Sequence, residues 1–275
     1  MRYGISTVVL GRTDLEAALH RIAVAGFEQI EILTEPPHLW PGDHEPQQVL
    51  ALLDQLGLHA RVGHGIYSHG NPNCGSLDEV KRRQAVTQIA TCFEPLVAVG
   101  AEFVVLHPTG YSLDYTDENR PRVIDQVRRS MAELSAIAAD VGIRPAWENL
   151  PHHHTSRPLH DMTELCSLIN EMPANVGLCL DTTHALIAGH DPLEQLNIAA
   201  HRLLCLHLHD SDGAGDRHWV PGQGIIEWNP FIARLDEMGF TGTRTIEVVS
   251  TDETEDLVLT EAAAMARKWE GEGSV

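Results

Sequence analysis

Lysine, aromatic residues and long hydrophobic runs are all scarce in this 275-residue sequence. The only lysines are Lys81 and Lys268, and 19 Lys and Arg against 39 Asp and Glu leave a formal charge of −20. Such a field repels polyanions, so a nucleic-acid partner is not expected, although a local basic patch can outweigh the total. No run approaches the ~20 apolar residues of a membrane-spanning helix. Because a strand-like run begins at Tyr3, we expect no secretory leader and a cytoplasmic protein.

Cysteine is also scarce, with five residues at positions 74, 92, 166, 179 and 205 and no Cys-x-x-Cys pair. The odd count argues against a disulfide framework and indicates reduced thiols. Histidine, by contrast, is abundant, with 17 residues. Imidazole is the commonest metal-ligating side chain, so the positions of these histidines decide whether they form a site or only decorate the surface.

Short β-like runs alternate with longer amphipathic stretches along the whole chain. Continuous apolar runs are typical of strands buried on both faces. The pattern therefore predicts an α/β fold, a single-domain (β/α)8 TIM barrel over residues 1–270, with a short tail at 271–275. A doubly wound open sheet is the alternative, but residues 6–11 lack the G-x-G-x-x-G turn that it would need. The eight predicted strands are Tyr3–Thr7, Phe27–Leu33, Leu58–His64, Glu102–His107, Ile143–Glu148, Val176–Asp181, Leu203–His209 and Thr243–Val249.

Capping and stop signals mark the expected helix boundaries. The segments Thr13–Glu16 and Ser76–Glu79 both fit a capping box, in which the last Glu reaches back to the cap N–H. Pro95 is expected to kink or split the third helical stretch. Glycines follow five expected helices, as the glycine stop signal requires, at Gly26, Gly57, Gly100, Gly142 and Gly239.

Ionisable side chains stand at the C-terminal ends of most predicted strands, which is where TIM barrels place their active sites. An unpaired buried charge is costly, and a divalent cation removes the repulsion among several converging carboxylates. We therefore predict a divalent-metal site at this face. Glu31 is left open between a substrate contact and a structural role. The residues at these ends are Glu31, His64, His107, Glu148, Asp181 with His184, His207 with His209 and Asp210, and Glu247.

Two loops carry further polar residues. In the glycine-rich loop 211–224, Asp216 and His218 can both reach a metal, which leaves Arg217 free for a substrate anion. The run His152–His154 is expected to form a solvated loop, because adjacent residues cannot all face one ion. Candidates for an apolar wall against a small ligand are Trp40, Trp147 and Trp219.

Several segments, in order and at matching spacing, resemble the xylose-isomerase-like TIM-barrel superfamily over essentially the whole chain. This superfamily groups sugar phosphate isomerases and epimerases with enzymes of the endonuclease-IV (AP endonuclease family 2) type. The sharpest segments are the Leu-Asp-x-x-His-Ala run at 180–185 and the Asp-Arg-His run at 216–218, which is followed by Gly-Gln-Gly at 222–224. The others lie at 64–67, 105–108, 147–149, 206–210 and 245–247.

The resemblance implies a core metal held by four residues from the fifth to eighth strands. Three carboxylates and one imidazole suit Mn²⁺ and also accept Zn²⁺. In the epimerase-like members, two carboxylates move a proton beside a metal-polarised carbonyl. The resemblance assigns those catalytic roles to Glu148 and Glu247. The implied core ligands are Glu148, Asp181, His207 and Glu247.

The endonuclease-like members add ligands for two more zinc ions, and this sequence has a match for each of them. A cluster of up to three ions serves phosphate-ester hydrolysis. The resemblance also places Tyr67 in a substrate-binding loop. The additional ligands that it implies are His64, His107, His184, Asp216 and His218.

Three hypotheses for the function stay open. The favoured one is a divalent-metal-dependent isomerase or epimerase of a small sugar, keto-sugar or sugar phosphate. The alternatives are a zinc phosphoesterase of the endonuclease-IV type and a non-enzymatic barrel that binds a sugar or polyol. Loops near the mouth are acidic or neutral, for example residues 34–37, which disfavours a DNA substrate; oligomerisation stays open. The expected substrate-binding residues are His209, Arg217, Trp147 and Trp219, and the expected anion contacts near the mouth are Arg120, Arg157 and Arg217.

Overall fold

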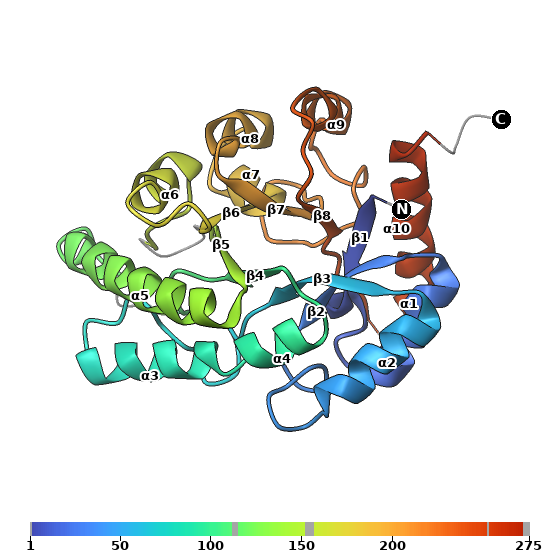
Figure 1. Ribbon diagram of the computed structural model, residues 1–275. Coiled ribbons are helices and arrows are strands. Elements are labelled where there is room, and N and C mark those ends of the chain that lie inside the picture. The colour runs from blue at the N-terminus through green and yellow to red at the C-terminus, as the bar shows by residue number, and fades with distance from the viewer. Residues whose placement is uncertain (1, 112–114, 152–156, 252, 272–275) are drawn as a thin grey trace.

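A computed structural model of the protein describes residues 2–111, 115–151, 157–251 and 253–271. Eight parallel strands form a closed barrel in which each strand pairs with its neighbours in the sequence and β8 pairs with β1. The helices lie around the strands (Figure 1), so the predicted TIM barrel is confirmed. The strands are β1 (Tyr3–Ser6), β2 (Gln29–Leu33), β3 (His59–His64), β4 (Phe103–Leu106), β5 (Arg144–Glu148), β6 (Gly177–Asp181), β7 (Leu203–Leu208) and β8 (Thr243–Ile246).

The outer layer follows the same alternation. A 3₁₀ turn, η1 (Thr7–Leu10), follows β1, and the loop between β6 and β7 holds two helices. Among the described residues, every helix is too short or too polar to cross a bilayer. The predicted tail at 271–275 lies, from 272 on, outside the described residues. The helices are α1 (Leu15–Ala25), α2 (Pro46–Leu56), α3 (Glu79–Ala90), α4 (Phe93–Ala98), α5 (Arg120–Val141), α6 (Met162–Ile169), α7 (Thr182–Ile187), α8 (Pro192–Ala199), α9 (Trp228–Glu237) and α10 (Glu255–Trp269).

Helix boundaries follow the sequence signals with one correction. The predicted capping boxes at Thr13 and Ser76 are wrong, because Asp14 caps α1 and Asp78 caps α3. Asp14 Oδ1 accepts from the Ala17 N–H at 3.0 Å, and Asp78 Oδ1 accepts from the Val80 N–H at 2.9 Å. An ionised carboxylate also interacts favourably with the helix dipole at this end, which a hydroxyl cannot do.

Glycine and proline act at the helix ends as expected. Gly26 and Gly142 adopt positive φ angles of 95° and 85° and end α1 and α5, which a residue with a Cβ does less readily. The third helical stretch is split, as predicted from Pro95. The break precedes this proline, which lies in the first turn of α4, where its missing N–H leaves no helical hydrogen bond unmade.

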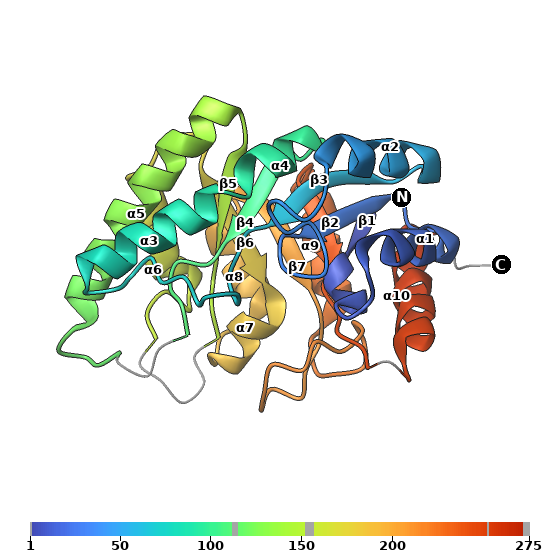
Figure 2. The ribbon, with the colours of Figure 1, turned by 90° about the horizontal axis from the view of Figure 1, so that it is seen from below.

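The strands carry one layer of buried side chains on each of their two faces. The barrel interior holds a small cluster that includes Val105, Ala146 and Cys179. The larger cluster lies between strands and helices and includes Trp147. Because strand side chains alternate between faces, Trp147 points outward while its neighbour Glu148 points inward. Figure 2 shows α7 and the loop between β7 and α9 projecting from the same side of the barrel.

Candidate metal centre

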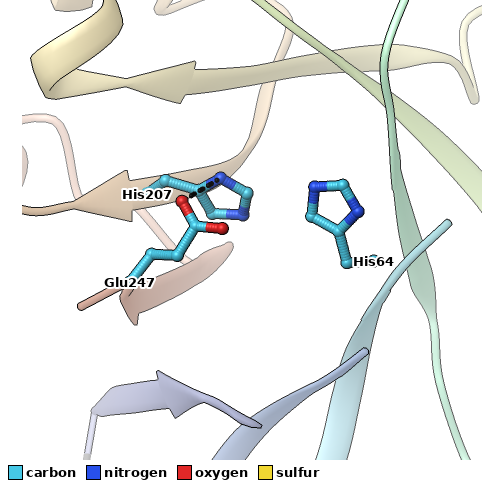
Figure 3. Close-up of side chains that lie close together, drawn as sticks. All are labelled: His64, His207 and Glu247. Carbon is cyan, nitrogen blue, oxygen red and sulfur yellow. Dashed lines mark ion pairs between the residues drawn. The ribbon is translucent and has the colours of Figure 1, made fainter. Parts of the chain in front are cut away.

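The four implied core ligands all meet at the imidazole of His207. Its Nδ1 lies 3.1 Å from Glu148 Oε1, 3.2 Å from Glu247 Oε2 and 3.9 Å from Asp181 Oδ2. Figure 3 shows Glu247 turned toward His207, with His64 approaching from the opposite side of the barrel. Asp181 and His207 are directly paired in the β6–β7 register, which brings their side chains to the same level.

The additional ligands form two further groups beside this one. His107 Nε2 lies 3.0 Å from Glu148 Oε2, and His64 Nε2 lies 3.6 Å from the same oxygen. On the other side, Asp216 Oδ2 lies 3.2 Å from His184 Nε2 and 3.3 Å from His218 Nε2. In each group, ligand atoms of the three residues lie within 4.8 Å of one another. The structure thus brings together all nine predicted ligands.

The donor set fits a divalent cation. Four buried polar atoms of the cluster have no hydrogen-bond partner among the described residues. Buried polar atoms are almost always satisfied, so these atoms call for a cation, water or substrate. Carboxylate oxygens mixed with imidazole nitrogens suit Mn²⁺ or Zn²⁺. The four atoms are Glu31 Oε1, Glu148 Oε2, His209 Nδ1 and Asp216 Oδ1, of which Glu148 Oε2 has His107 Nε2 at 3.0 Å but without hydrogen-bond geometry.

Burial and charge act against each other in this cluster. Burial opposes ionisation of Glu148, yet the imidazoles of His207 and His107 hold its pKa well below the usual range. Burial raises the pKa of the Glu247 carboxyl above its ordinary value. Burial likewise lowers the pKa of His107 to about 4, whereas the Asp216 carboxylate, against the effect of burial, raises that of His218 to about 9.

Glu31 belongs to the cluster, a role that the sequence left open. Its side chain is fully buried, and Oε2 lies 2.8 Å from His207 Nε2. When Nε2 carries the proton and donates a hydrogen bond to Glu31, the lone pair of Nδ1 is directed at Glu148 and Glu247. Such a carboxylate fixes the tautomer and orientation of a ligating imidazole. The only signal in the sequence was its position near the end of a predicted strand.

The predicted substrate-binding residues have different outcomes. His209 lies in the cluster, with Nε2 2.7 Å from Asp181 Oδ2 and its ring stacked on His218 at 4.1 Å between centroids. Arg217 Nη2 pairs with Asp212 Oδ2 at 3.1 Å, and both side chains are partly exposed, so the contact of Arg217 with a substrate anion stays a prediction. Trp147 is fully buried in the outer apolar cluster, so the structure gives no support to its substrate contact. Trp219 is 37% exposed on the loop after β7.

Nearby residues shape the cluster or its loops. Tyr67 packs against His64 and His107 at 4.8 and 5.0 Å between ring centroids, and its role in a substrate-binding loop stays a prediction. Asp210 is structural, because its Oδ2 accepts from Trp228 Nε1 and from the Gly222 N–H, both at 2.8 Å. It thereby anchors the glycine-rich loop. The predicted solvated loop His152–His154 lies outside the described residues.

A closed barrel whose strand ends gather carboxylates and imidazoles defines the class: a TIM barrel with a candidate metal centre. Residues 19–269 match the family model described as xylose isomerase-like TIM barrel, and the chain belongs to this family. The resemblance seen in the sequence is therefore confirmed.

Proteins named as endonucleases and proteins named as epimerases are both similar to this chain. A probable endonuclease 4 of Trichlorobacter lovleyi is 26% identical over 79% of this chain and 82% of its own length. A fructoselysine 3-epimerase of Shigella flexneri is 23% identical over 91% of both chains. The crystal structure of a D-tagatose 3-epimerase-like protein superposes with a TM-score of 0.85 and 24% identity, covering 98% of this chain and 97% of that one.

Proposed function

We propose that this protein is a divalent-metal-dependent enzyme that isomerises or epimerises a small sugar, keto-sugar or sugar phosphate by proton transfer next to a carbonyl. One observation carries the proposal: Glu148, from β5, and Glu247, just after β8, approach the same His207 Nδ1 at 3.1 and 3.2 Å. Two carboxylates at one point, next to imidazole ligands, can serve as base and acid on a carbon between them. The similarity to a fructoselysine 3-epimerase supports this choice.

In this proposal Glu148, Asp181, His207 and Glu247 hold the cation. The chemistry that a divalent cation would supply at these residues is polarisation of a substrate carbonyl, which would make the adjacent C–H bond more acidic. One of Glu148 and Glu247 removes the proton and the other supplies a proton to the opposite face. Both are buried, with exposed fractions of 1% and 8%, so bulk water is kept from the reacting carbon. Glu31 orients His207, and Trp219 is retained as the candidate for an apolar wall.

A panel of ketoses tests the proposal. Wild-type protein loaded with Mn²⁺ or Zn²⁺ is incubated with C5 and C6 ketoses and their phosphate esters, and the products are separated by chromatography. A stereoisomer or aldose should form from at least one of them and disappear with chelator. If no member of the panel is converted under any metal loading, the proposal fails.

A second candidate, a zinc phosphoesterase of the endonuclease-IV type, is favoured by one specific observation. The three ligand groups, centred on His207, on Glu148 and on Asp216, could hold more than one ion, and several ions together suit phosphate-ester hydrolysis. The net charge of −20 opposes a DNA substrate. Incision of an abasic-site duplex at physiological salt by wild type, lost in Glu148→Gln, would promote this candidate.

A further inference from the structure

Three arginine side chains are buried in the described part of the chain, and their surroundings differ. Arg82 is fully buried and pairs with Glu79 at 2.9 Å and Glu133 at 2.7 Å. Arg244 is 4% exposed and lies 3.1 Å from Asp236. Arg157 is 5% exposed, and no carboxylate of the described residues lies within ion-pairing distance of it. Buried charges are normally paired, so Arg157 is the exception that needs an explanation.

The guanidinium of Arg157 is also only partly hydrogen-bonded. Nε donates to Thr109 Oγ1 at 3.2 Å, and Nη2 donates to the Thr109 carbonyl at 3.3 Å. Its face stacks on Tyr111, with Cζ 4.8 Å from the ring centroid. A guanidinium carries five N–H donors, and Nη1 has no hydrogen-bond acceptor among the described residues. The group is therefore fixed in place by Thr109 and Tyr111, and within the described segments Nη1 is left to donate to a further acceptor.

The position of Arg157 links it to the metal centre. Thr109, its main partner, follows the ligand His107 by two residues on the loop after β4. Tyr111, which covers the guanidinium, is 55% exposed, so this pair lies where solvent reaches the mouth of the barrel. Among the described carboxylates, Glu148 of the cluster favours the charged form of Arg157 from beyond ion-pairing distance, so the guanidinium lies near the cluster without a directly paired counter-ion.

The other arginines expected near the mouth are engaged. Arg120 Nη2 lies 2.6 Å from Glu164 Oε1, and Arg217 pairs with Asp212. Of the three arginines that the sequence offered as anion contacts, Arg157 alone lacks a carboxylate partner among the described residues. In a chain with a charge of −20, a cation kept in this state is well placed to receive a negative group from outside.

We infer that Arg157, held by Thr109 and Tyr111, is a subsite for an oxyanion of the substrate, a phosphate or a carboxylate carried away from the reacting carbon. The planar fork of arginine matches the paired oxygens of either group. Arg157 thereby selects a sugar phosphate or sugar acid over a neutral sugar. The inference rests on the proposed function for the nature of the reaction, but the anion subsite itself can be tested without turnover.

The experiment titrates inorganic phosphate and acetate into metal-loaded protein by calorimetry. The variants are Arg157→Gln, Arg157→Lys and the control Arg83→Gln, an exposed arginine on α3 that pairs with Glu79. The metal content of each is measured first, so that lost anion binding cannot arise from a lost cation. We expect Arg157→Gln to weaken binding of the preferred anion at least tenfold and Arg157→Lys to weaken it less. Arg83→Gln should leave it within about twofold. Stronger binding of phosphate indicates a sugar phosphate, and stronger binding of acetate indicates a sugar acid.

Absence of anion binding in wild type, or equal affinity in wild type and Arg157→Gln, overturns the inference. If Arg157→Gln does not fold, Arg157→Lys keeps the test decisive. An anion affinity of Arg157→Lys equal to that of wild type also contradicts the inference, because lysine lacks the planar donor fork of arginine. The ketose panel run on the same samples separates the two proposals. Conversion of neutral ketoses without an Arg157-dependent anion site removes the inference and leaves the proposed function. Arg157-dependent anion binding without conversion of any ketose removes the proposed function and leaves the inference.

Discussion

His207 Nε2 lies 2.8 Å from Glu31 Oε2, and both side chains are completely buried. This pair connects β2 with β7 across the barrel, and it leaves the opposite nitrogen of His207 facing Glu148 and Glu247. We therefore expect Glu31 to influence the candidate metal centre by orienting His207.

Glu31→Gln should weaken metal binding about 10–100-fold, the range found when a partner behind a ligating histidine is removed. The amide can still accept from Nε2, but it no longer supplies a negative charge. Asp181→Asn, which alters a direct ligand, should lose more. Metal affinity is measured by competition with a chromophoric chelator. An affinity of Glu31→Gln within twofold of wild type would show that Glu31 has no part in orienting His207.

His184→Ala should lower the number of bound metal ions without emptying the core site. His184 Nε2 and His218 Nε2 both approach Asp216. His184 Nδ1 lies 3.3 Å from Glu148 Oε1 and 2.9 Å from the Asn149 carbonyl, so Nε2 is the nitrogen that can serve a second ion. Metal per chain is counted by plasma mass spectrometry on protein purified without chelator. The comparison is Asp181→Asn, which should strip the core site. One ion per chain in both wild type and His184→Ala would restrict the centre to a single metal and favour the isomerase over the phosphoesterase.

Buried His38 should make the protein less stable in mild acid. Its Nε2–H donates to the carbonyls of Leu10 and Thr13, both at 3.2 Å, and burial lowers the pKa of the imidazole. The folded state therefore resists a proton that the unfolded state accepts below its pKa of ~6.5. This contribution is absent above that pH. Below it, the free energy of unfolding falls by at most about 1.4 kcal/mol per pH unit until the folded pKa is reached.

His38→Gln isolates this effect, because an amide N–H can donate to the same carbonyls without titrating. Urea unfolding between pH 7.5 and 5 should show a shallower loss of stability in His38→Gln than in wild type. His20→Gln, at an exposed position on α1, is the matched control and should follow wild type. Parallel curves for wild type and His38→Gln would contradict the assignment.

The barrel and the grouping of the candidate ligands could be predicted because both depend on local patterns. Continuous apolar strands fix the closed sheet, and a parallel barrel brings every strand end to one face, so His64 and Glu148 meet although they are distant in sequence. Partners chosen by side-chain geometry could not be predicted. Trp147 points away from the barrel interior and is buried under the helices, which depends on strand register. The pairing of Arg217 with Asp212 depends on the conformation of a loop. The contact of Glu31 with His207 joins side chains from opposite sides of the barrel.

The most direct test of the central claim follows a single proton. Metal-loaded wild type is incubated in D₂O with the ketose that the panel identifies, and NMR records deuterium at the carbon next to the carbonyl. Glu247 faces His207 Nδ1 at 3.2 Å, so Glu247→Gln removes one of the two proton carriers while keeping the size of the side chain. The account predicts deuterium incorporation by wild type and a loss of at least 100-fold in Glu247→Gln. Exchange that continues at the wild-type rate in Glu247→Gln with its metal retained, or no exchange in wild type, would contradict it.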